Sequence, residues 1–334
     1  MVTIYDVSER AGVSLATVSR VMNNNARVSD KTKAKVLQAM ADLGYRPNAI
    51  AKGLASSRSN SVGVLISELH GPFYGMMMSA IETELRKHDI HSIFAAGHSD
   101  AAKEEDAVNF LLSRRCDALI LYVEAVSDEF LVELNKRGTP IVVLGRDIKN
   151  LQPQCINLDN EQGGYLAAKY LLDAGHRDIA YISGPLWKVD TQDRLAGHRR
   201  ALAEHQLTFD ESLLIEGDFQ EEGGVDGLNK LLSSGRPFTA VACGNDEMAA
   251  GAMAAARDAG MTLPDDLSIV GFDNVAYSRF VYPKLCTVNY PVREMAEMAT
   301  HWVLRQVYDH TRFEIENTFT PVMVERNSVL RVQK

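Results

Sequence analysis

The sequence has no long apolar run, few cysteines and none of the common signature motifs of enzymes. A helix that crosses a bilayer needs about 20 consecutive apolar residues, and no segment reaches that length. The opening residues, MVTIYDV, lack the pattern of a secretory signal peptide. We therefore expect a cytoplasmic protein without a membrane segment.

Cysteine is scarce, and the four thiols (Cys116, Cys155, Cys243 and Cys286) lie far apart in the sequence. Structural zinc sites need cysteines or histidines paired at short spacing, which these residues do not provide. We expect them to be small core residues in a reducing compartment. Neither a metal nor a cofactor is expected.

Catalytic motifs are also missing from the chain. It has no Gly-rich phosphate loop, no Gly-x-Ser-x-Gly turn and no His-Glu-x-x-His metal pair. The nine histidines are scattered, as surface or core histidines would be. The sequence therefore favours a protein that is not an enzyme.

The net charge of −9 conceals an asymmetry along the chain. Residues 1–60 hold nine Lys and Arg against four Asp and Glu, a net charge of +5. The remaining residues hold 26 basic against 40 acidic side chains, a net charge of −14. Such a division indicates a basic DNA-binding module attached to an acidic body.

The stretch Thr3–Asn24 predicts two short helices joined by a tight turn. Thr3 is a good N-cap, and Asp6 three residues later completes a capping box. Gly12 supplies the backbone freedom for the turn, and Ser14 caps the second helix. This is the pattern of a helix-turn-helix, although a plain surface helix hairpin would share it.

The second helix has two faces of different chemistry. Val18, Val21 and Met22 recur at helical spacing and are expected to point inward. The outward set comprises Leu15, Ala16, Thr17, Ser19 and Arg20. Hydroxyls, one apolar pair and one arginine suit phosphates and base edges better than burial.

A third helix and a linker complete the amino-terminal part. Ser29 is expected to cap a helix that reaches about Leu43, with Gly44 as its C-cap. After a break at Pro47, Asn48–Ala55 could form two further turns, weakened by a glycine that costs roughly 1 kcal/mol in a helix. A polar linker follows to residue 61.

From residue 62 onward, short apolar runs alternate with helical stretches, which predicts parallel sheets with helices on both faces. The apolar runs are Val62–Ile66, His91–Ala95, Ala118–Val123, Pro140–Leu144, Ile179–Ile182, Ala240–Cys243 and Leu267–Gly271, and the tail adds Leu285–Asn289, a helix near Pro291–Tyr308 and a strand near Phe319–Glu325. Because the series is too long for one compact sheet, we expect two α/β lobes.

Several motifs resemble the LacI/GalR family of bacterial repressors. The stretches DVSERAGVS, ATVSRV and GYRPNAIA resemble that family's opening segment. In the body, NLDN from Asn157, RLAG from Arg194, GND from Gly244 and GFDN from Gly271 resemble further family landmarks. The residues 238–253, 288–295 and 320–322 look most like the galactose-repressor branch.

The resemblance implies an all-α helix-turn-helix head followed by a two-lobed α/β body like a periplasmic binding protein, with two doubly wound parallel sheets. We expect a head at 1–46, a hinge helix and linker at 47–60, and three crossings between the lobes. By similarity the first lobe is 61–157 with 287–318, and the second is 158–286 with 319–334.

The residues expected to contact DNA lie in the head and the hinge. They are Tyr5, Ser14, Leu15, Ala16, Thr17, Ser19, Arg20, Asn23, Ser29, Thr32, Tyr45, Asn48, Ala51 and Leu54. In the family-like mechanism, two copies pair so that their heads contact adjacent half-sites of a pseudo-palindrome. The hinge orders on DNA, and Leu54 wedges into the minor groove.

A small effector is expected in the cleft between the lobes. Arg194 offers a planar set of five donors, Asn245 can donate and accept, and Asp273 follows an apolar strand, where open α/β sheets present ligand residues. Phe73, Tyr74 and Trp187 could cover a sugar ring, and Arg146 is a fourth polar candidate. Taken singly, an ion pair for Arg194, a loop cap for Asp273 and a core position for Phe73 remain open.

The partners expected are double-stranded operator DNA, a sugar effector and a second copy of the chain. Galactose or a galactoside is favoured, a glucoside is next, and a purine is the third candidate. Leu15 stands where the galactose branch usually has valine, which leaves the operator preference open. Because the chain ends soon after the last expected strand, without a Leu-heptad tail, we expect a dimer. A transport-type binding protein is the rival interpretation, but it would lack the basic head.

Overall fold

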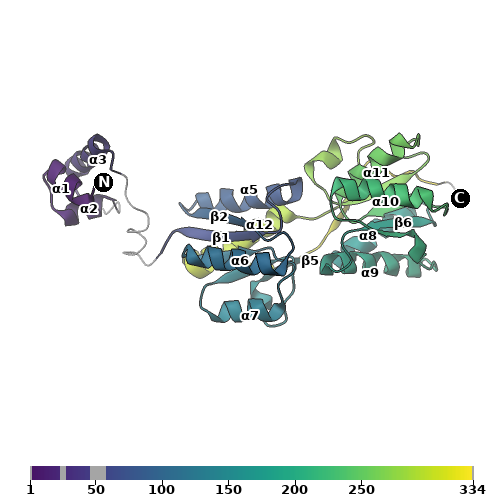
Figure 1. The fold of residues 1–334 in the computed structure, drawn as a ribbon, viewed down its shortest axis with the longest axis horizontal. Helices are drawn as coiled ribbons and strands as arrows, with labels where there is room; N and C mark the ends of the chain where they lie inside the picture. Colours follow the sequence, from purple (N-terminus) through teal and green to yellow (C-terminus); the bar gives the residue numbers. More distant parts are fainter. Residues whose placement is uncertain (1, 23–27, 46–57, 333–334) are drawn as a thin grey trace. The chain divides into compact units, whose positions relative to one another are not determined.

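The computed structural model describes residues 2–22, 28–45 and 58–332. It divides into two compact units, residues 1–60 and residues 61–334 (Figure 1). The predicted DNA-contact residues Asn23, Asn48, Ala51 and Leu54 lie outside the described residues, as does most of the expected hinge. Each unit is therefore considered by itself.

In the described part of the first unit, residues 2–22, 28–45 and 58–60, the helices are α1 (Ile4–Ala11), α2 (Leu15–Met22) and α3 (Asp30–Leu43). Their ends confirm the predicted capping signals. Thr3 and Asp6 form the capping box, and the Ser29 hydroxyl accepts from the Thr32 amide. Gly12 and Gly44 end α1 and α3 with φ of 66° and 62°, left-handed values that favour glycine.

The head has a small apolar core of its own. Its buried side chains come from all three helices and are Val7, Val18, Val21, Val36 and Ala39. The expected inward face of α2 is thus confirmed at Val18 and Val21, while Met22 is half-buried at its edge. Packing of these valines leaves the opposite face of α2 toward solvent.

The second unit is built on two six-stranded sheets, which confirms the predicted pair of α/β lobes. The first sheet has the order β11-β5-β4-β3-β1-β2, with every pair parallel. Its strands are β1 (Ser61–Ile66), β2 (His91–Ala96), β3 (Ala118–Leu121), β4 (Ile141–Leu144), β5 (Cys155–Leu158) and β11 (Thr318–Phe319).

Helices cover both faces of this first sheet. On one face α5 (Pro72–Arg86) and α12 (Val292–Val307) pack side by side, although they are far apart in the sequence (Figure 1). On the other face α6 (Ala101–Ser113) and α7 (Asp128–Lys136) cover a separate apolar cluster. The central strands β3 and β4 are entirely buried because both faces of the sheet are covered.

The second sheet has the order β12-β10-β9-β8-β6-β7. Its strands are β6 (Ile179–Ser183), β7 (Leu214–Glu216), β8 (Ala240–Cys243), β9 (Ser268–Asp273), β10 (Cys286–Asn289) and β12 (Val322–Val324), of which only β12 is antiparallel to its neighbour. The helices α8 (Asn160–Asp173) and α9 (Val189–Glu204) cover one face, and α10 (Glu221–Ser233) and α11 (Asp246–Asp258) cover the other. Three short 3₁₀ turns lie at Gln152–Gln154, Glu211–Leu213 and Ala276–Arg279.

The chain passes between the two sheets three times, slightly later than the expected boundaries. A boundary after residue 286 would cut β10, because that strand pairs with β9 as far as Asn289 opposite Asp273. A boundary after residue 318 would cut β11, which pairs with β5 through Phe319 opposite Leu158. Strand pairing therefore keeps residues 287–289 with the second sheet and residues 158 and 319 with the first.

The four cysteines are buried and free, as the sequence predicts. Among residues 2–22, 28–45 and 58–332, no helix is both long and apolar enough to span a membrane.

Candidate functional site

The exposed face of α2 is the first candidate site. Ala16, Ser19 and Arg20 are exposed, while Leu15 and Thr17 are half-buried beside them. The Ser14 hydroxyl accepts from the Thr17 amide at 3.2 Å and lies 2.9 Å from the Thr17 hydroxyl. This capping arrangement orders the start of α2 and leaves small polar and apolar groups available at its surface.

Other predicted DNA-contact residues surround this face or brace it. Tyr5 on α1 is 67% exposed, so its ring and hydroxyl are accessible. The Ser29 and Thr32 hydroxyls lie 3.0 Å apart at the start of α3, where amide groups favour anions. Tyr45 is half-buried against the apolar core of the head. Tyr45 therefore packs against the core while part of its side chain stays accessible to solvent.

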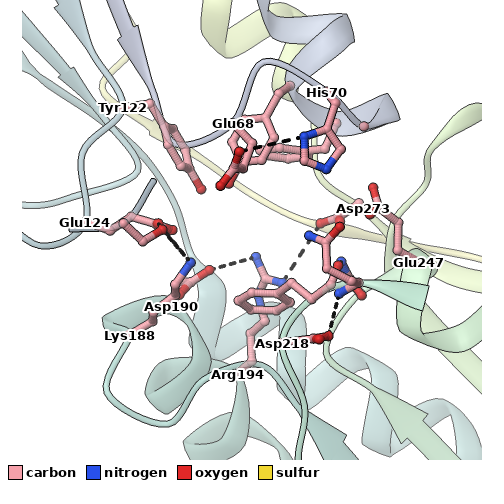
Figure 2. Close-up of a pocket in the computed structure, with 17 residues that line it drawn as sticks. Glu68, His70, Tyr122, Glu124, Lys188, Asp190, Arg194, Asp218, Glu247 and Asp273 are labelled. Atoms are coloured by element: carbon pink, nitrogen blue, oxygen red, sulfur yellow. Dashed lines mark hydrogen bonds and ion pairs between the residues drawn. The ribbon is translucent and has the colours of Figure 1, made fainter. Parts of the chain in front are cut away.

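The second candidate site is a pocket in the body, of about 710 Å³ with its open mouth included. Both lobes contribute to its walls, and most of the lining residues follow the carboxyl ends of parallel strands. The lining consists of Glu68, His70, Gly71, Phe73, Tyr74, Ser99, Tyr122 and Glu124 from the first lobe, with Lys188, Asp190, Arg194, Asp218, Phe219, Gln220, Asn245, Glu247 and Asp273 from the second. Figure 2 shows the charged groups converging on the space between them.

Arg194 is the central cation of the pocket and is only 3% exposed. Its Nε donates to Asn160 at 2.9 Å, and its Nη1 donates to the carbonyl of Gly244 at 2.6 Å. The guanidinium lies 3.8 Å from the centre of the Phe272 ring, which fixes its plane. Arg194 is therefore a buried, oriented donor and not a surface ion pair of α9.

Two carboxylates flank Arg194. Its Nη2 lies 3.6 Å from Asp190 Oδ2, and its Nη1 lies 3.9 Å from Asp273 Oδ1. Burial raises the pKa of Asp273 well above its usual value, and the charge of Arg194 opposes that shift. Burial also raises the pKa of Asp190, and the charge of Arg194 again opposes the shift. One guanidinium is thus shared by two carboxyl groups, whose oxygens can also accept hydrogen bonds from a ligand.

The backbone at Asp273 is held in a conformation unusual for a residue with a side chain. Its φ is 105° at the end of β9, and strain of this kind persists where the surroundings enforce it. Behind the loop, buried Asp246 accepts from the Thr287 hydroxyl at 2.5 Å and from the Val275 amide at 2.9 Å. Burial raises the pKa of Asp246 to about 7. Asp246 therefore positions the loop that presents Asp273.

Asn245 begins α11 and combines a structural role with its place in the pocket. Its side-chain oxygen accepts from the Met248 amide at 2.9 Å, and its nitrogen donates to the Phe219 carbonyl at 2.8 Å. One lone pair and one N–H remain for a ligand, since an amide offers two of each. Its orientation is thereby fixed before any ligand binds.

Aromatic rings form the apolar wall. Phe73 lies edge-on to Tyr74, Tyr122 and Tyr290, with ring centres 5.4, 6.0 and 5.0 Å away. Phe73 is nine-tenths buried, so it is both a core residue and part of the lining. Such a wall suits the apolar face of a ring-shaped ligand.

Two predicted ligand residues are not brought into this pocket. Trp187 is 51% exposed, and its neighbour Lys188 enters the pocket instead. Arg146 donates to the Val126 carbonyl at 2.7 Å and forms an ion pair with Asp128, which turns it toward a smaller hollow nearby. Neither side chain lines the pocket, and for Arg146 the reason is its contacts with Val126 and Asp128.

Sequence reasoning missed the acidic residues of the pocket and its second cation. Lys188 Nζ donates to Glu124 at 2.8 Å and to Ser99 at 3.2 Å, and so joins the two lobes. Glu68, Glu124 and Asp218 each stand two or three residues after a strand. That placement was the available signal, since ligand residues gather beyond the carboxyl ends of parallel strands.

Comparisons with known proteins match both parts of the chain. The family described as "Bacterial regulatory proteins, lacI family" matches residues 3–48, and "Periplasmic binding protein-like domain" matches residues 168–329. The chain is 38% identical to the HTH-type transcriptional regulator GalR of Escherichia coli (strain K12), over 98% of this chain and 96% of that protein. A repressor PurR of Edwardsiella ictaluri is 35% identical over 98% of this chain and 97% of its own.

Solved structures extend the similarity to the fold. A crystal structure of the lac repressor dimer bound to operator and the anti-inducer ONPF has a TM-score of 0.87 at 31% identity, covering 98% of this chain and 99% of that one. A complex of the transcriptional regulator CelR with cellobiose has a TM-score of 0.71 at 28% identity, covering 98% of this chain and 100% of that one.

Proposed function

This chain belongs to the LacI/GalR family of bacterial transcriptional regulators, and from that premise we propose that it represses sugar-utilisation genes and is released from its operator by a sugar. The observation that carries the sugar proposal is the set of oriented polar groups at Arg194, Asn245 and Asp273, beside an aromatic wall. Such a set offers donors and acceptors to paired hydroxyls, while the rings cover the apolar face of a sugar.

Within this family, galactose or a galactoside is the effector we favour. The similarity to GalR of Escherichia coli supports that choice. A glucoside is the second candidate, supported by the similarity to the CelR–cellobiose complex. A purine is the third, supported by the similarity to PurR.

We propose that the protein acts as a homodimer on a pseudo-palindromic operator, because a twofold protein matches two half-sites. The similarity to the lac repressor dimer bound to operator supports this arrangement. Arg20, Ser19 and Ala16 on α2 would contact base edges, and residues 47–60 would form the hinge between the head at 1–46 and the body. The lobes would be residues 61–157 with 287–318 and 158–286 with 319–334, adjusted by the few residues that strand pairing requires.

A transport-type binding protein and an enzyme are the other functions to weigh. The basic head argues against transport, because a transport-type binding protein does not need an exposed helix that suits DNA. We propose that the chain is not an enzyme, since its pocket residues serve binding and its relatives are regulators. Acting on DNA also implies a cytoplasmic location.

A screen of sugars by thermal shift tests the effector, because a ligand that binds the folded state raises the melting temperature by mass action. A selection from random duplexes tests DNA binding. We expect one enriched pseudo-palindrome and a galactose-type ligand. Enrichment of no sequence would contradict the regulator interpretation, and stabilisation only by glucosides or purines would replace the favoured effector.

A further inference from the structure

The pocket lining holds more carboxyl groups than cations. Its lining holds six carboxylates (Glu68, Glu124, Asp190, Asp218, Glu247 and Asp273) but only two permanent cations, Lys188 and Arg194. Both cations are already engaged, Lys188 with Glu124 and Arg194 with two aspartates. A neutral sugar would accept and donate hydrogen bonds here but would bring no cation to the remaining carboxyl groups.

Glu247 is the carboxylate that most lacks a partner. It is 8% exposed and lies in the first turn of α11, yet no donor of the described part of the chain is within hydrogen-bond distance of it. Its Oε1 faces Gly71 of the other lobe, 3.4 Å from where a side chain there would begin. Figure 2 shows Glu247 on the same side of the pocket as Asp273.

The surroundings of Glu247 disfavour its charge but leave it available. Burial raises its pKa to about 7, and Glu221 adds to the rise while His70 opposes it. At neutral pH the group is therefore poised between its two states. An unpaired buried carboxylate is costly, so a cation placed beside it would gain a charge-assisted hydrogen bond and hold the carboxylate ionised.

We propose that the effector is an amino sugar, whose ammonium group pairs with Glu247 while its hydroxyls bind Arg194, Asn245 and Asp273. This inference rests on the proposed sugar effector and makes it more specific. The ring would lie against Phe73 and Tyr74, and its amino group would point toward α11 and Gly71. Sugar phosphates are disfavoured, because the same carboxylates would repel an anion.

Calorimetric titration of the full-length protein at pH 7 tests the inference. The probes are D-galactosamine, 6-amino-6-deoxy-D-galactose and D-galactose, since a single substitution of an amino group for a hydroxyl separates each amine from the neutral sugar. We expect at least one amine to bind about tenfold more tightly than galactose, the usual gain from one charge-assisted bond. Glu247→Gln should remove that difference.

Glu222→Gln, an exposed residue of α10, is the control and should preserve the preference for the amine. If galactose binds as tightly as both amines in the wild type, the inference fails while the sugar-effector proposal stands. A preference for the amine that persists in a folded Glu247→Gln variant would also overturn it. If neither the amines nor galactose bind, both the sugar-effector proposal and this inference fail.

Discussion

Lys188 Nζ of the second lobe lies 2.8 Å from Glu124 Oε2 of the first, with side chains that are 9% and 12% exposed. Ser67 and Ser99 also donate to this carboxylate, so that the first lobe holds it in place for the lysine. The pair is thus a direct link between the lobes at the edge of the ligand pocket. It stabilises the approach of the lobes without any ligand.

Glu124→Gln should separate the lobes in the ligand-free protein. Removing one member of a buried pair leaves the other charge uncompensated, at a cost of about 3–5 kcal/mol, unless water reaches it. Opening of the cleft would hydrate Lys188, so we expect a larger radius of gyration by small-angle X-ray scattering. Glu133→Gln, which affects an exposed pair with Lys136, should leave the radius unchanged. An unchanged radius in both variants would contradict a linking role.

Asp273→Asn should weaken sugar binding by roughly one to two powers of ten, since a lost charged partner costs about 1.5–3 kcal/mol. Asparagine tolerates positive φ values, so the backbone at 105° should survive the change. Calorimetric titration measures the effect, with Asp226→Asn on α10 as an exposed control. Operator affinity in the absence of sugar should not change. Equal sugar affinity in wild type and Asp273→Asn would remove this residue from the site.

Arg20→Ala should weaken binding to the operator much more than binding to a scrambled duplex. A contact from arginine to a guanine edge contributes about 1–3 kcal/mol of discrimination, whereas a phosphate contact contributes equally on both DNAs. Lys35→Ala removes an exposed charge on α3 and should reduce both affinities equally. Fluorescence anisotropy at fixed salt measures all three proteins. Equal losses on the two duplexes for Arg20→Ala would make it a phosphate contact.

The buried His198 should make stability depend on pH. It is fully buried beside Tyr181 and Phe209, and burial lowers its pKa to about 3. In the unfolded chain His198 therefore binds a proton near pH 6.5, whereas in the folded chain it stays neutral down to about pH 3. Above pH 6.5 the histidine is neutral in both states, so it does not change the free energy of unfolding. Below pH 6.5 that free energy falls by about 1.4 kcal/mol per pH unit, because only the unfolded chain binds the proton.

Urea unfolding between pH 5 and 7 measures this contribution. His198→Leu removes the titrating group, so its free energy of unfolding should fall less steeply with acid than that of the wild type. His91→Leu, an exposed position, is the control and should keep the wild-type slope. Parallel slopes for His198→Leu and wild type would show that His198 is not the source.

The head and the alternation of strands and helices could be predicted because their signals are local. Thr3 with Asp6, Gly12 and Gly44 act within a few residues of their own positions, so sequence spacing was sufficient. The strand β5 was missed because the polar Asn157 interrupts its apolar run, and β7 was missed because it contains only three residues. Such short segments form through pairing with neighbouring strands and not through their own periodicity.

The pocket was predictable only in part. Arg194, Asn245 and Asp273 occur in recognisable motifs that directly follow or face strand ends. The pairing of Lys188 with Glu124 joins residues 64 positions apart, and no local pattern indicates it. Arg146 was misplaced because the direction of its side chain depends on Asp128 and the Val126 carbonyl, which the fold brings close.

The central claim is that the head and the pocket are coupled, and one titration tests it most directly. The sugar that stabilises the protein most is titrated calorimetrically into the full-length chain, with and without the selected operator duplex. Thermodynamic linkage requires operator DNA to lower sugar affinity by the same factor by which sugar lowers operator affinity, typically about 5- to 150-fold. The account predicts weaker sugar binding on the operator. Identical sugar affinity in the two titrations would contradict a sugar-released repressor.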